Sequence, residues 1–438
     1  MQESHSEIMA RLYGRALKDN WVRACRNITF QVTEDCQCRC KYCYEPIKRK
    51  HSMPWPVGKA IVDYLFRLWD EDDSSAYISK DTKGIVLDFI GGEPLLEIEL
   101  IDRICDYFWH EALRREECLW GDTFRISMIS NGVSYFDPSV QRFLQKYRDR
   151  LSFAITIDGP KEMHDSCRVF PDGSGTWEMA NAAQKHYHNT YGGYLGTKVT
   201  IAPENLPYLH TIFKYFADEG YLEIHANPVF EHEWTPDEAF LYFHELVLIA
   251  DEILSHDEYS AIQTSLFDDR LFGPIPETDL QPWCGGTGAM MAFDPDGNAY
   301  PCLRYMESSL NGEQKPLIIG DCFSGAYFNQ EHKSIRSWLE AMNRRTSCDD
   351  ECFYCPIAKG CASCAAWNYQ KYGTPDKKDK GICWMHRARS LANAFYWNRK
   401  WRLEGSKKRM PILLEPEHAL KIVTKREFDS LIEAAKGE

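Results

Sequence analysis

Features that would direct a chain to a membrane, out of the cell or onto nucleic acid are missing from this 438-residue sequence. Residues 1–20 are polar and charged and lack the apolar core of a signal peptide. No run approaches the roughly 18–20 apolar residues that span a bilayer. Acidic residues outnumber basic ones by 65 to 51, and the net charge of −14 argues against a nucleic-acid binder. We therefore expect a cytoplasmic protein that binds neither membrane nor nucleic acid.

Cysteine is the unusual component of the composition. The seventeen cysteines fall short of the roughly 8–10% typical of small disulfide scaffolds. Five lie within residues 1–43, three within 44–283 and nine within 284–383. Disulfides rarely persist in the cytoplasm, where clustered thiols more often hold metal. The distribution therefore predicts two metal-binding regions.

Short apolar runs alternate with helical patterns over the first half of the chain. Strands are expected at 26–32, 84–90, 124–129, 151–157, 196–201 and 221–229, and helices at 56–69, 100–113 and 206–218. This alternation indicates an α/β fold with a parallel sheet, in which ligands bind at the carboxyl ends of the strands. Gly, Asn, Asp and Cys residues follow several of these strands, which predicts the active site there. From about residue 283 the chain reads as loop-rich, and helices return at 385–403 and within 415–436.

Cys36, Cys40 and Cys43 form a C-x3-C-x2-C motif directly after the first expected strand, with Tyr42 just before the last cysteine. Three thiolates on one short loop can bind three irons of a 4Fe–4S cluster and leave the fourth iron open. A zinc site would need a further ligand or a catalytic water, and the next histidine along the chain is His51. The motif therefore favours an iron–sulfur cluster.

Together with Gly91-Gly92-Glu93-Pro94 after the second strand, this motif resembles the radical S-adenosylmethionine (SAM) superfamily. The resemblance implies a partial (β/α)6 barrel in which SAM chelates the open iron. Gly91, Gly92 and Glu93 would bind the methionine amine, because glycines allow close approach and a carboxylate pairs with an ammonium. Arg168 would pair with a SAM or peptide carboxylate, or else form a surface salt bridge. The other residues expected near SAM are Tyr42, Pro94, Ser130, Asn131, Thr156 and Asp158.

The second cysteine group resembles the SPASM extension of peptide- and protein-modifying radical SAM enzymes, which holds two auxiliary 4Fe–4S clusters. It begins with Cys284-x12-Gly297-x4-Cys302. Cys322 or Cys348 would supply a fourth ligand of the inner cluster, unless that iron is open to substrate. A pair of zinc ribbons is the alternative for this region. By the resemblance, the outer cluster would be held by Cys352, Cys355, Cys361 and Cys383, and the inner one by Cys284, Cys302 and Cys364.

The resemblance also implies the reaction: a 5′-deoxyadenosyl radical, formed by reductive cleavage of SAM, abstracts hydrogen from the substrate. Three 4Fe–4S clusters, SAM and an external one-electron reductant such as flavodoxin or ferredoxin would be required. Anaerobic sulfatase-maturing enzymes place an aspartate base after the cysteine of Gly-x4-Cys, whereas Leu303 stands here and cannot accept a proton. We therefore expect a maturase that forms a cysteine thioether cross-link in a ribosomal precursor peptide.

Several alternatives to thioether formation stay open. Cyclophane-type carbon–carbon cross-linking, epimerisation and formylglycine formation are the enzymatic ones, and an iron–sulfur electron carrier is the non-enzymatic one. No individual catalytic residue is predicted. The expected organisation is a helical lead-in at 1–24, the barrel at 25–240, a helical linker at 241–283, the SPASM domain at 284–385 and a helical extension at 386–438. Residues 387–409 hold eight basic residues and one acidic residue, which suits a solvated helix or an acidic leader peptide.

Overall fold

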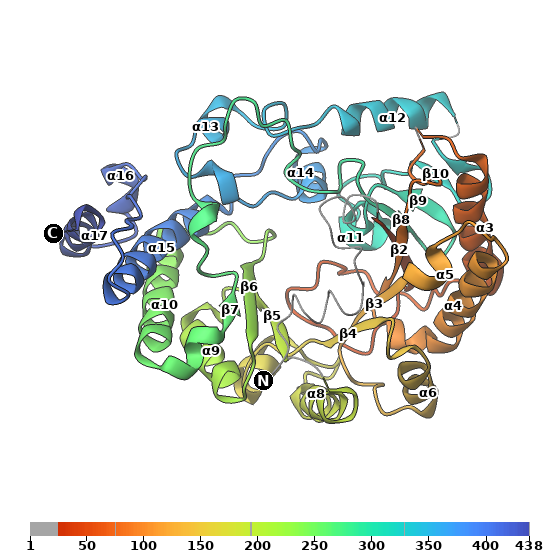
Figure 1. The fold of residues 1–438 in the computed structure, drawn as a ribbon, viewed down its shortest axis with the longest axis horizontal. Coiled ribbons are helices and arrows are strands. Elements are labelled where there is room, and N and C mark those ends of the chain that lie inside the picture. Colours follow the sequence, from red (N-terminus) through yellow and green to blue (C-terminus); the bar gives the residue numbers. More distant parts are fainter. Residues whose placement is uncertain (1–24, 75, 193–194, 328, 438) are drawn as a thin grey trace. The chain divides into compact units, whose positions relative to one another are not determined.

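The computed structural model describes residues 25–437 except residues 75, 193–194 and 328 (Figure 1). The helical lead-in expected at 1–24 lies outside the described residues. Two compact units make up the described chain. Unit 1 contains the chain up to Gln37, Glu45–Ile155 and Gly285–Ala341, and unit 2 contains Cys38–Tyr44, Thr156–Cys284 and the chain from Met342 onward.

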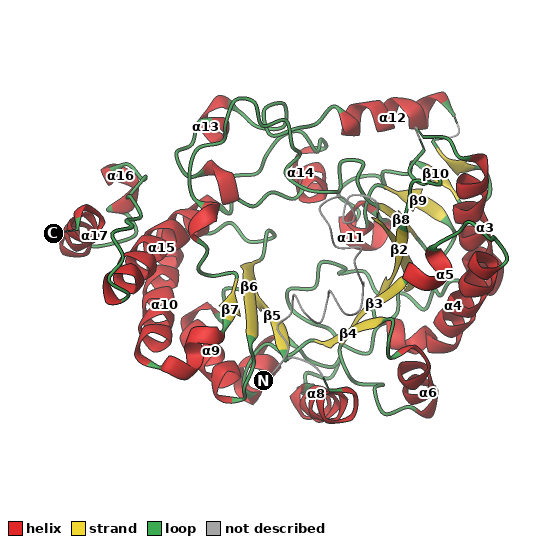
Figure 2. Cartoon of the chain, viewed as in Figure 1, coloured by secondary structure: helices red, strands yellow, loops and turns green. Residues whose placement is uncertain are grey.

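Unit 1 is built on an eight-stranded sheet with the strand order β11-β10-β9-β8-β1-β2-β3-β4 (Figure 2). Strands β1 to β4 run parallel, and β1 is buried on both faces from Ile28 to Thr33, as expected of a central parallel strand. The strands are β1 (Cys25–Thr33), β2 (Gly84–Gly91), β3 (Arg125–Ser130), β4 (Leu151–Ile155), β8 (Met291–Phe293), β9 (Asn298–Tyr300), β10 (Gly320–Asp321) and β11 (Gly325–Ala326).

Three amphipathic helices of unit 1, α3, α4 and α6, bury their apolar stripes beside this sheet. The rings of Phe66 in α3 and Phe108 in α4 lie 5.2 Å apart, and both contact Trp120 of α5. The carboxyl ends of β1, β2 and β3 are each followed by a loop or turn. The helices are α3 (Trp55–Glu71), α4 (Ile98–Leu113), α5 (Trp120–Thr123), α6 (Pro138–Tyr147), α11 (Glu307–Leu310) and α12 (Gln330–Glu340).

Unit 2 contains a parallel sheet of β5 (Gly196–Ile201), β6 (Glu223–Pro228) and β7 (Gln263–Thr264). Helix α10 packs against α9 and α15 (Figure 1). In the part of the chain that the structure describes, no helix has both the length and the apolar character of a membrane span. The helices are α7 (Lys161–Cys167), α8 (Trp177–Tyr191), α9 (Leu209–Asp218), α10 (Pro236–Ser255), α13 (Asp350–Phe353), α14 (Ala365–Tyr372), α15 (Cys383–Leu403), α16 (Pro416–Ala419) and α17 (Lys425–Lys436).

The mixed α/β class, the parallel strands and the helical C-terminal segment are confirmed, with element ends that differ from the prediction by a few residues. From about residue 283 the chain is rich in loops, as predicted, but residues 285–341 also contribute short strands to a sheet. There β8 to β11 extend the unit 1 sheet, and β8 pairs in parallel with β1. Strands of two or three residues are too short to show a periodic pattern, which is why the sequence does not reveal them.

Candidate active site and cysteine clusters

Gly92 packs the end of β2 against the loop that carries Cys36. A methyl group at Gly92 would stand 2.6 Å from the carbonyl carbon of Asp35 and 2.9 Å from Cβ of Cys36, whereas ordinary contacts begin at 3.4 Å. The N–H of Gly92 also donates to the carbonyl oxygen of Thr33 at 2.9 Å. Gly91 is similarly tight, because a methyl group there would stand 3.1 Å from Cγ2 of Thr33. The close approach of two backbones therefore requires both glycines.

Glu93 joins the ends of β2 and β3. Its side chain is buried, with an exposed fraction of 1%. Oε1 accepts hydrogen bonds from the N–H of Leu95 at 3.1 Å and from the hydroxyl of Ser130 at 2.8 Å, and Oε2 accepts one from the N–H of Asn131 at 2.8 Å. A carboxylate has about four acceptor sites, so the protein itself uses most of them. The next residue, Pro94, is buried and begins a single helical turn.

Asn131 links the end of β3 to Cys36. Its Nδ2 lies 3.7 Å from Sγ of Cys36 and 3.3 Å from Oε1 of Gln37, while its Oδ1 accepts a hydrogen bond from the N–H of Val133 at 2.8 Å. Gln37 in turn donates to the hydroxyl of Ser134 at 2.9 Å. An amide donor stabilises negative charge on a thiolate. The first cysteine of the motif is thus held from two strand ends.

Tyr42 of unit 2 lies between Asp158 and Arg168. Its hydroxyl donates to the Asp158 carboxylate and accepts from Nη1 of Arg168 at 3.0 Å. Burial, and then the negative charge of Asp158, raises the pKa of Tyr42 well above its usual range, and the Cys40 thiolate adds to this effect. Arg168 thus contacts Tyr42, and it forms no surface ion pair in the described part of the chain. Thr156, which follows β4, is half-buried.

His164, to which the sequence assigns no role, supports these three residues. It is fully buried, and its Nδ1 accepts from the N–H of Asp158 at 3.3 Å. The Thr176 hydroxyl donates to the carbonyl oxygen of Arg168 at 3.1 Å, so the Nε2–H of His164 donates to Thr176 Oγ1 at 2.9 Å. Burial, and then the charge of Arg168, lowers the pKa of His164 to about 3. The signal in the sequence is its position four residues before Arg168.

The four cysteines expected to hold the outer cluster all belong to unit 2. The N–H of Cys355 donates to the carbonyl oxygen of Cys352 and that of Cys361 to the carbonyl oxygen of Ala358, so these cysteines lie on short turns. Burial, and then the Cys361 thiolate, raises the pKa of Cys383 to about 11. Cys361 also contributes to raising the pKa of Cys355, and Cys383 contributes to raising the pKa of Cys352. Four thiols within one unit, three of them on short turns, are a set of residue types that suits an iron–sulfur cluster.

The segment before Cys383 is anchored to its surroundings by consecutive side chains. Nζ of Lys378 donates to the carbonyl oxygen of Ala362 at 2.6 Å. Nζ of Lys380 pairs with Asp349 at 2.7 Å and with Glu351 at 2.6 Å. Sequence patterning does not reveal these roles, because a basic run usually lies in solvent. Between these lysines, the buried Asp379 carboxylate accepts hydrogen bonds from the side chains of Trp367, Lys371 and Tyr372.

The cysteines expected to hold the inner cluster are divided between the units. Cys302 follows β9 in unit 1, whereas Cys284 and Cys364 belong to unit 2. The thiol of Cys364 caps α14 by accepting from the N–H of Trp367 at 3.4 Å. All seventeen cysteines lie within the described residues, and no two of them are joined by a disulfide. Within the same described residues, no three His, Cys, Asp or Glu side chains are grouped as ligands of a single metal ion.

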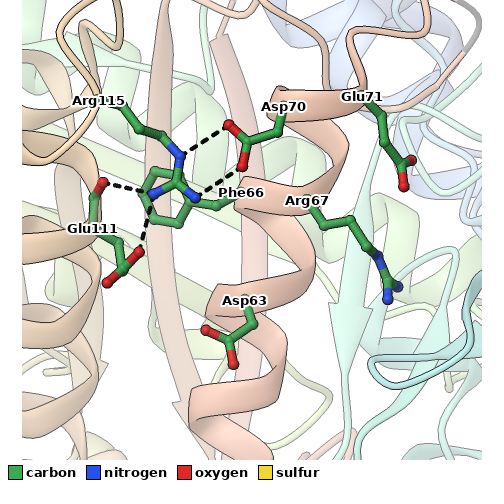
Figure 3. A pocket seen from close by; sticks show the side chains of 7 residues that line it. All are labelled: Asp63, Phe66, Arg67, Asp70, Glu71, Glu111 and Arg115. Atoms are coloured by element: carbon green, nitrogen blue, oxygen red, sulfur yellow. Dashed lines mark hydrogen bonds and ion pairs between the residues drawn. The ribbon is translucent and has the colours of Figure 1, made fainter.

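A surface groove between α3 and α4 lies apart from these residues within unit 1. Figure 3 shows Arg115 donating to Asp70 and Glu111 across it. The groove has a volume of about 440 Å³ and is lined by exposed charged side chains and Phe66. None of the cysteines or expected SAM contacts lines it. It is a salt-bridged groove of the helical layer and is not part of the candidate site.

Comparison with known proteins identifies the first part of the chain. Residues 23–164 match the family described as a 4Fe-4S single cluster domain. An uncharacterised protein of Methanocaldococcus jannaschii is 25% identical over 44% of this chain and 59% of its own length. An AdoMet-dependent heme synthase of Oleidesulfovibrio alaskensis is 26% identical over 45% of this chain and 44% of its own length. The chain thus spans about half the length of these two curated relatives.

Longer matches cover most of the chain. The radical SAM cyclopropyl synthase TigE of Paramaledivibacter caminithermalis is 20% identical over 88% of this chain and 76% of its own length. Among solved structures, anSMEcpe with bound AdoMet and Kp18Cys peptide matches with a TM-score of 0.61 and 15% identity, over 87% of this chain and 99% of that one. Streptococcus suis SuiB bound to precursor peptide SuiA matches with a TM-score of 0.51 and 11% identity, over 81% and 75%. The chain therefore contains a radical SAM-type 4Fe-4S domain at residues 23–164, and its fold is that of anSMEcpe and SuiB.

Proposed function

We propose that this protein is a radical SAM maturase that abstracts hydrogen from a ribosomal precursor peptide and forms a cysteine thioether cross-link. The observation that carries the SAM part is the convergence of the ends of β2 and β3 on Cys36, through Gly92 and Asn131. In parallel sheets of this kind, ligands bind at the carboxyl ends of the strands.

Of the residues around the first cysteine motif, some would bind the iron–sulfur cluster and others position the residues that bind it. Cys36, Cys40 and Cys43 would hold a 4Fe–4S cluster, which would supply an iron site for SAM and the electron that cleaves it. Asn131 positions Cys36 and places an amide proton against its thiolate. Glu93, which accepts hydrogen bonds from Leu95, Ser130 and Asn131, would pair through its carboxylate with the methionine amine.

Tyr42 has a second task in this proposal. Its ring belongs to the cysteine loop, while its hydroxyl is held by Asp158, which follows β4 in the sequence, and by Arg168, which ends α7. The buried group sets the position of Cys40 and Cys43 on either side of Tyr42. Because Tyr42 and Asp158 are hydrogen-bonded to each other, we assign both to positioning the cysteine loop. Of the residues expected near SAM after β4, Thr156 would then contact SAM directly.

Support for a peptide substrate comes from the relatives and from the cysteines. SuiB binds a precursor peptide, and anSMEcpe binds AdoMet together with a peptide. The proposal includes two auxiliary 4Fe–4S clusters, held by the outer and inner cysteine sets, and a flavodoxin or ferredoxin as reductant. Leu303 follows Cys302 at the start of a helical turn and cannot serve as the base that formylglycine formation needs.

Carbon–carbon bond formation is the second candidate. The relative with the longest of the three alignments is named a radical SAM cyclopropyl synthase, and it covers 88% of this chain. Both reactions begin with hydrogen abstraction, so the same residues around the first cluster would serve either one. They differ in whether a peptide cysteine is consumed.

The test has one step without peptide and one with it. Anaerobically reconstituted protein is incubated with SAM and dithionite, and 5′-deoxyadenosine is quantified against Cys36→Ala. Production by the wild type alone is expected; no production by either would overturn the proposal and leave an iron–sulfur electron carrier. Cysteine-bearing peptides encoded beside the gene are then treated and weighed after iodoacetamide labelling. Loss of two hydrogens together with one alkylatable thiol indicates a thioether, and loss of two hydrogens with every thiol retained indicates a carbon–carbon bond.

A further inference from the structure

The parallel part of the unit 1 sheet has two unlike faces. On one face, the paired side chains of Phe89, Met128 and Phe153 are buried. On the other face, alternate residues of β3 and β4 are partly or fully exposed, and Ile129 has an exposed fraction of 61%. Parallel strands are usually covered on both faces. An open face on these strands therefore indicates a surface that a ligand covers.

Strand register aligns one row of polar side chains across this second face. The register pairs Thr29 of β1 with Asp88 of β2. It continues from Asp88 to Ser127 in β3, and from Ser127 to Ser152 in β4. Paired residues of neighbouring strands lie side by side on the same face. The four side chains therefore form one row, in which Asp88 is the charged member.

The carboxylate of Asp88 has hydroxyl partners but no counter-ion. The Thr29 hydroxyl donates to its Oδ2 at 3.1 Å, and the Ser127 hydroxyl also bonds to it. Asp88 is half-buried, and no Lys, Arg or His among the described residues forms an ion pair with it. Burial raises the pKa of Asp88, and the two hydroxyl groups offset this only in part. A buried charge without a partner is costly, and a cation supplied by a ligand would reduce that cost.

A second row lies between Asp88 and the carboxyl ends of the strands. Gln31 forms its β1 end, where Nε2 donates to Oε1 of Glu45 at 3.0 Å and to Oγ of Ser308 at 2.8 Å. Oε1 of Gln31 is buried and accepts no hydrogen bond from any described residue. This row thus combines an unused acceptor with an apolar surface. Its members are Gln31, Ile90, Ile129 and Ala154.

A lysine or arginine side chain matches the two rows in order. Ligands of parallel sheets bind at the carboxyl ends of the strands. Asp88 lies three residues before the end of β2, which at about 3.3 Å per residue is roughly 10 Å away, so only a long side chain reaches it from there. Lys and Arg bury an aliphatic stem along apolar surface and carry their charge at the tip. The net charge of −14 also attracts a cationic ligand.

We propose that the open face of β2 to β4 selects the precursor peptide by binding one of its lysine or arginine side chains. The charged end forms an ion pair with Asp88, and the aliphatic stem packs on Ile129. The unused Oε1 of Gln31 can accept an N–H of the same peptide. This inference rests on the proposed function, because its ligand is the peptide substrate, and it adds a residue type that the substrate carries.

The test compares two labelled glycine peptides, one with a central arginine and one with citrulline, which has a similar shape but no charge. Their affinities for the reconstituted full chain with SAM are measured anaerobically by fluorescence anisotropy. Wild type should bind the arginine peptide at least about tenfold more tightly, and Asp88→Asn less than about twofold more tightly. The matched control Asp149→Asn, which removes an exposed carboxylate, should keep the wild-type ratio. Ile129→Ala should weaken both peptides by about threefold and leave their ratio unchanged.

Other outcomes overturn the inference. Equal affinities for the two peptides in the wild type would do so, as would a tenfold ratio that persists in Asp88→Asn. A ratio lost equally in Asp149→Asn would assign the preference to overall charge, and unchanged affinities in Ile129→Ala would place the stem elsewhere. Asp88→Ser repeats the measurement if Asp88→Asn does not fold. Production of 5′-deoxyadenosine by the wild type is measured separately: its absence would overturn the proposed function, whereas the binding ratios decide this inference.

Discussion

Replacing Gly92 by alanine tests whether the end of β2 positions the first cysteine loop. The added methyl group would overlap the carbonyl group of Asp35, with 2.6 Å to its carbon and 2.9 Å to Cβ of Cys36. The Asp35 carbonyl is backbone and the position of Cβ of Cys36 is fixed by its own backbone, so neither can be rotated out of the way. To reach the 3.4 Å of an ordinary contact, the two backbones must separate by about 1 Å.

The expected loss of stability follows from that displacement. Overpacking of this size costs about 1–3 kcal/mol. The hydrogen bonds from Gly92 to Thr33 and from Glu93 to Asp35 are 2.9 Å long and would stretch with the gap, at about 1 kcal/mol each. We therefore expect the free energy needed to open the ends of β1 and β2 locally to fall by about 3–5 kcal/mol.

Amide hydrogen exchange of the apoprotein measures this change locally. At least about 100-fold faster exchange is expected for the last residues of β1 and β2, because each 1.4 kcal/mol is a factor of ten. Gly121→Ala is the control, since its methyl group would meet only the flexible end of Leu113, at 3.0 Å. Equal exchange in Gly92→Ala and wild type would refute the steric argument. Reconstituted Gly92→Ala should also lose the first cluster, about four irons of twelve.

Three further predictions concern unit 2. The folded chain keeps His164 neutral down to a pKa of about 3, whereas the unfolded chain protonates it near pH 6.5, so lowering the pH from 7 to 5 should reduce the free energy of unfolding by about 2 kcal/mol. Chemical denaturation of wild type and His164→Gln at both pH values checks this, and equal pH dependences would contradict it. Tyr42→Phe should cost about 1–3 kcal/mol because Asp158 loses a buried donor, while Tyr208→Phe, with an exposed side chain, should cost almost nothing; equal denaturation midpoints would count against the assignment. Asp379→Asn should speed amide exchange within residues 373–383 by at least about tenfold, because three side-chain donors lose a carboxylate acceptor, and unchanged exchange there would refute the anchoring role.

The parallel strands and the long helices could be predicted because their apolar patterns repeat over many residues. The same holds for the C-x3-C-x2-C motif and the two glycines, whose spacing carries chemical meaning. Glu93 shows what the sequence does not contain. Its partners Ser130 and Asn131 lie on the next strand, and only the pairing of β2 with β3 brings them together.

Cysteine spacing also does not show which turn a thiol faces. Cys322 and Cys348 are equivalent candidates in the sequence, because both lie between the inner and outer motifs. The structure distinguishes their surroundings. The N–H of Cys322 bonds to Gly297 in the turn before β9, whereas Cys348 packs against the cluster that contains Phe353. Burial of His164 is equally invisible in the sequence, because the short helix that carries it also holds Lys161, Glu162 and Asp165.

The parallel pairing of β8 with β1 makes the auxiliary region part of the first sheet. Residues 285–341 come after strands β1 to β7 in the sequence. They nevertheless cover the edge of β1 that β2 does not occupy. An edge stripped of its partner exposes unpaired backbone groups and invites pairing with other chains. A protein cut before residue 285 would therefore be prone to aggregate, and exchange of this region between relatives would have to carry β1 with it. Residues 285–341 and the strand β1 that they cover are consequently expected to be exchanged between relatives together, although they lie far apart in the sequence.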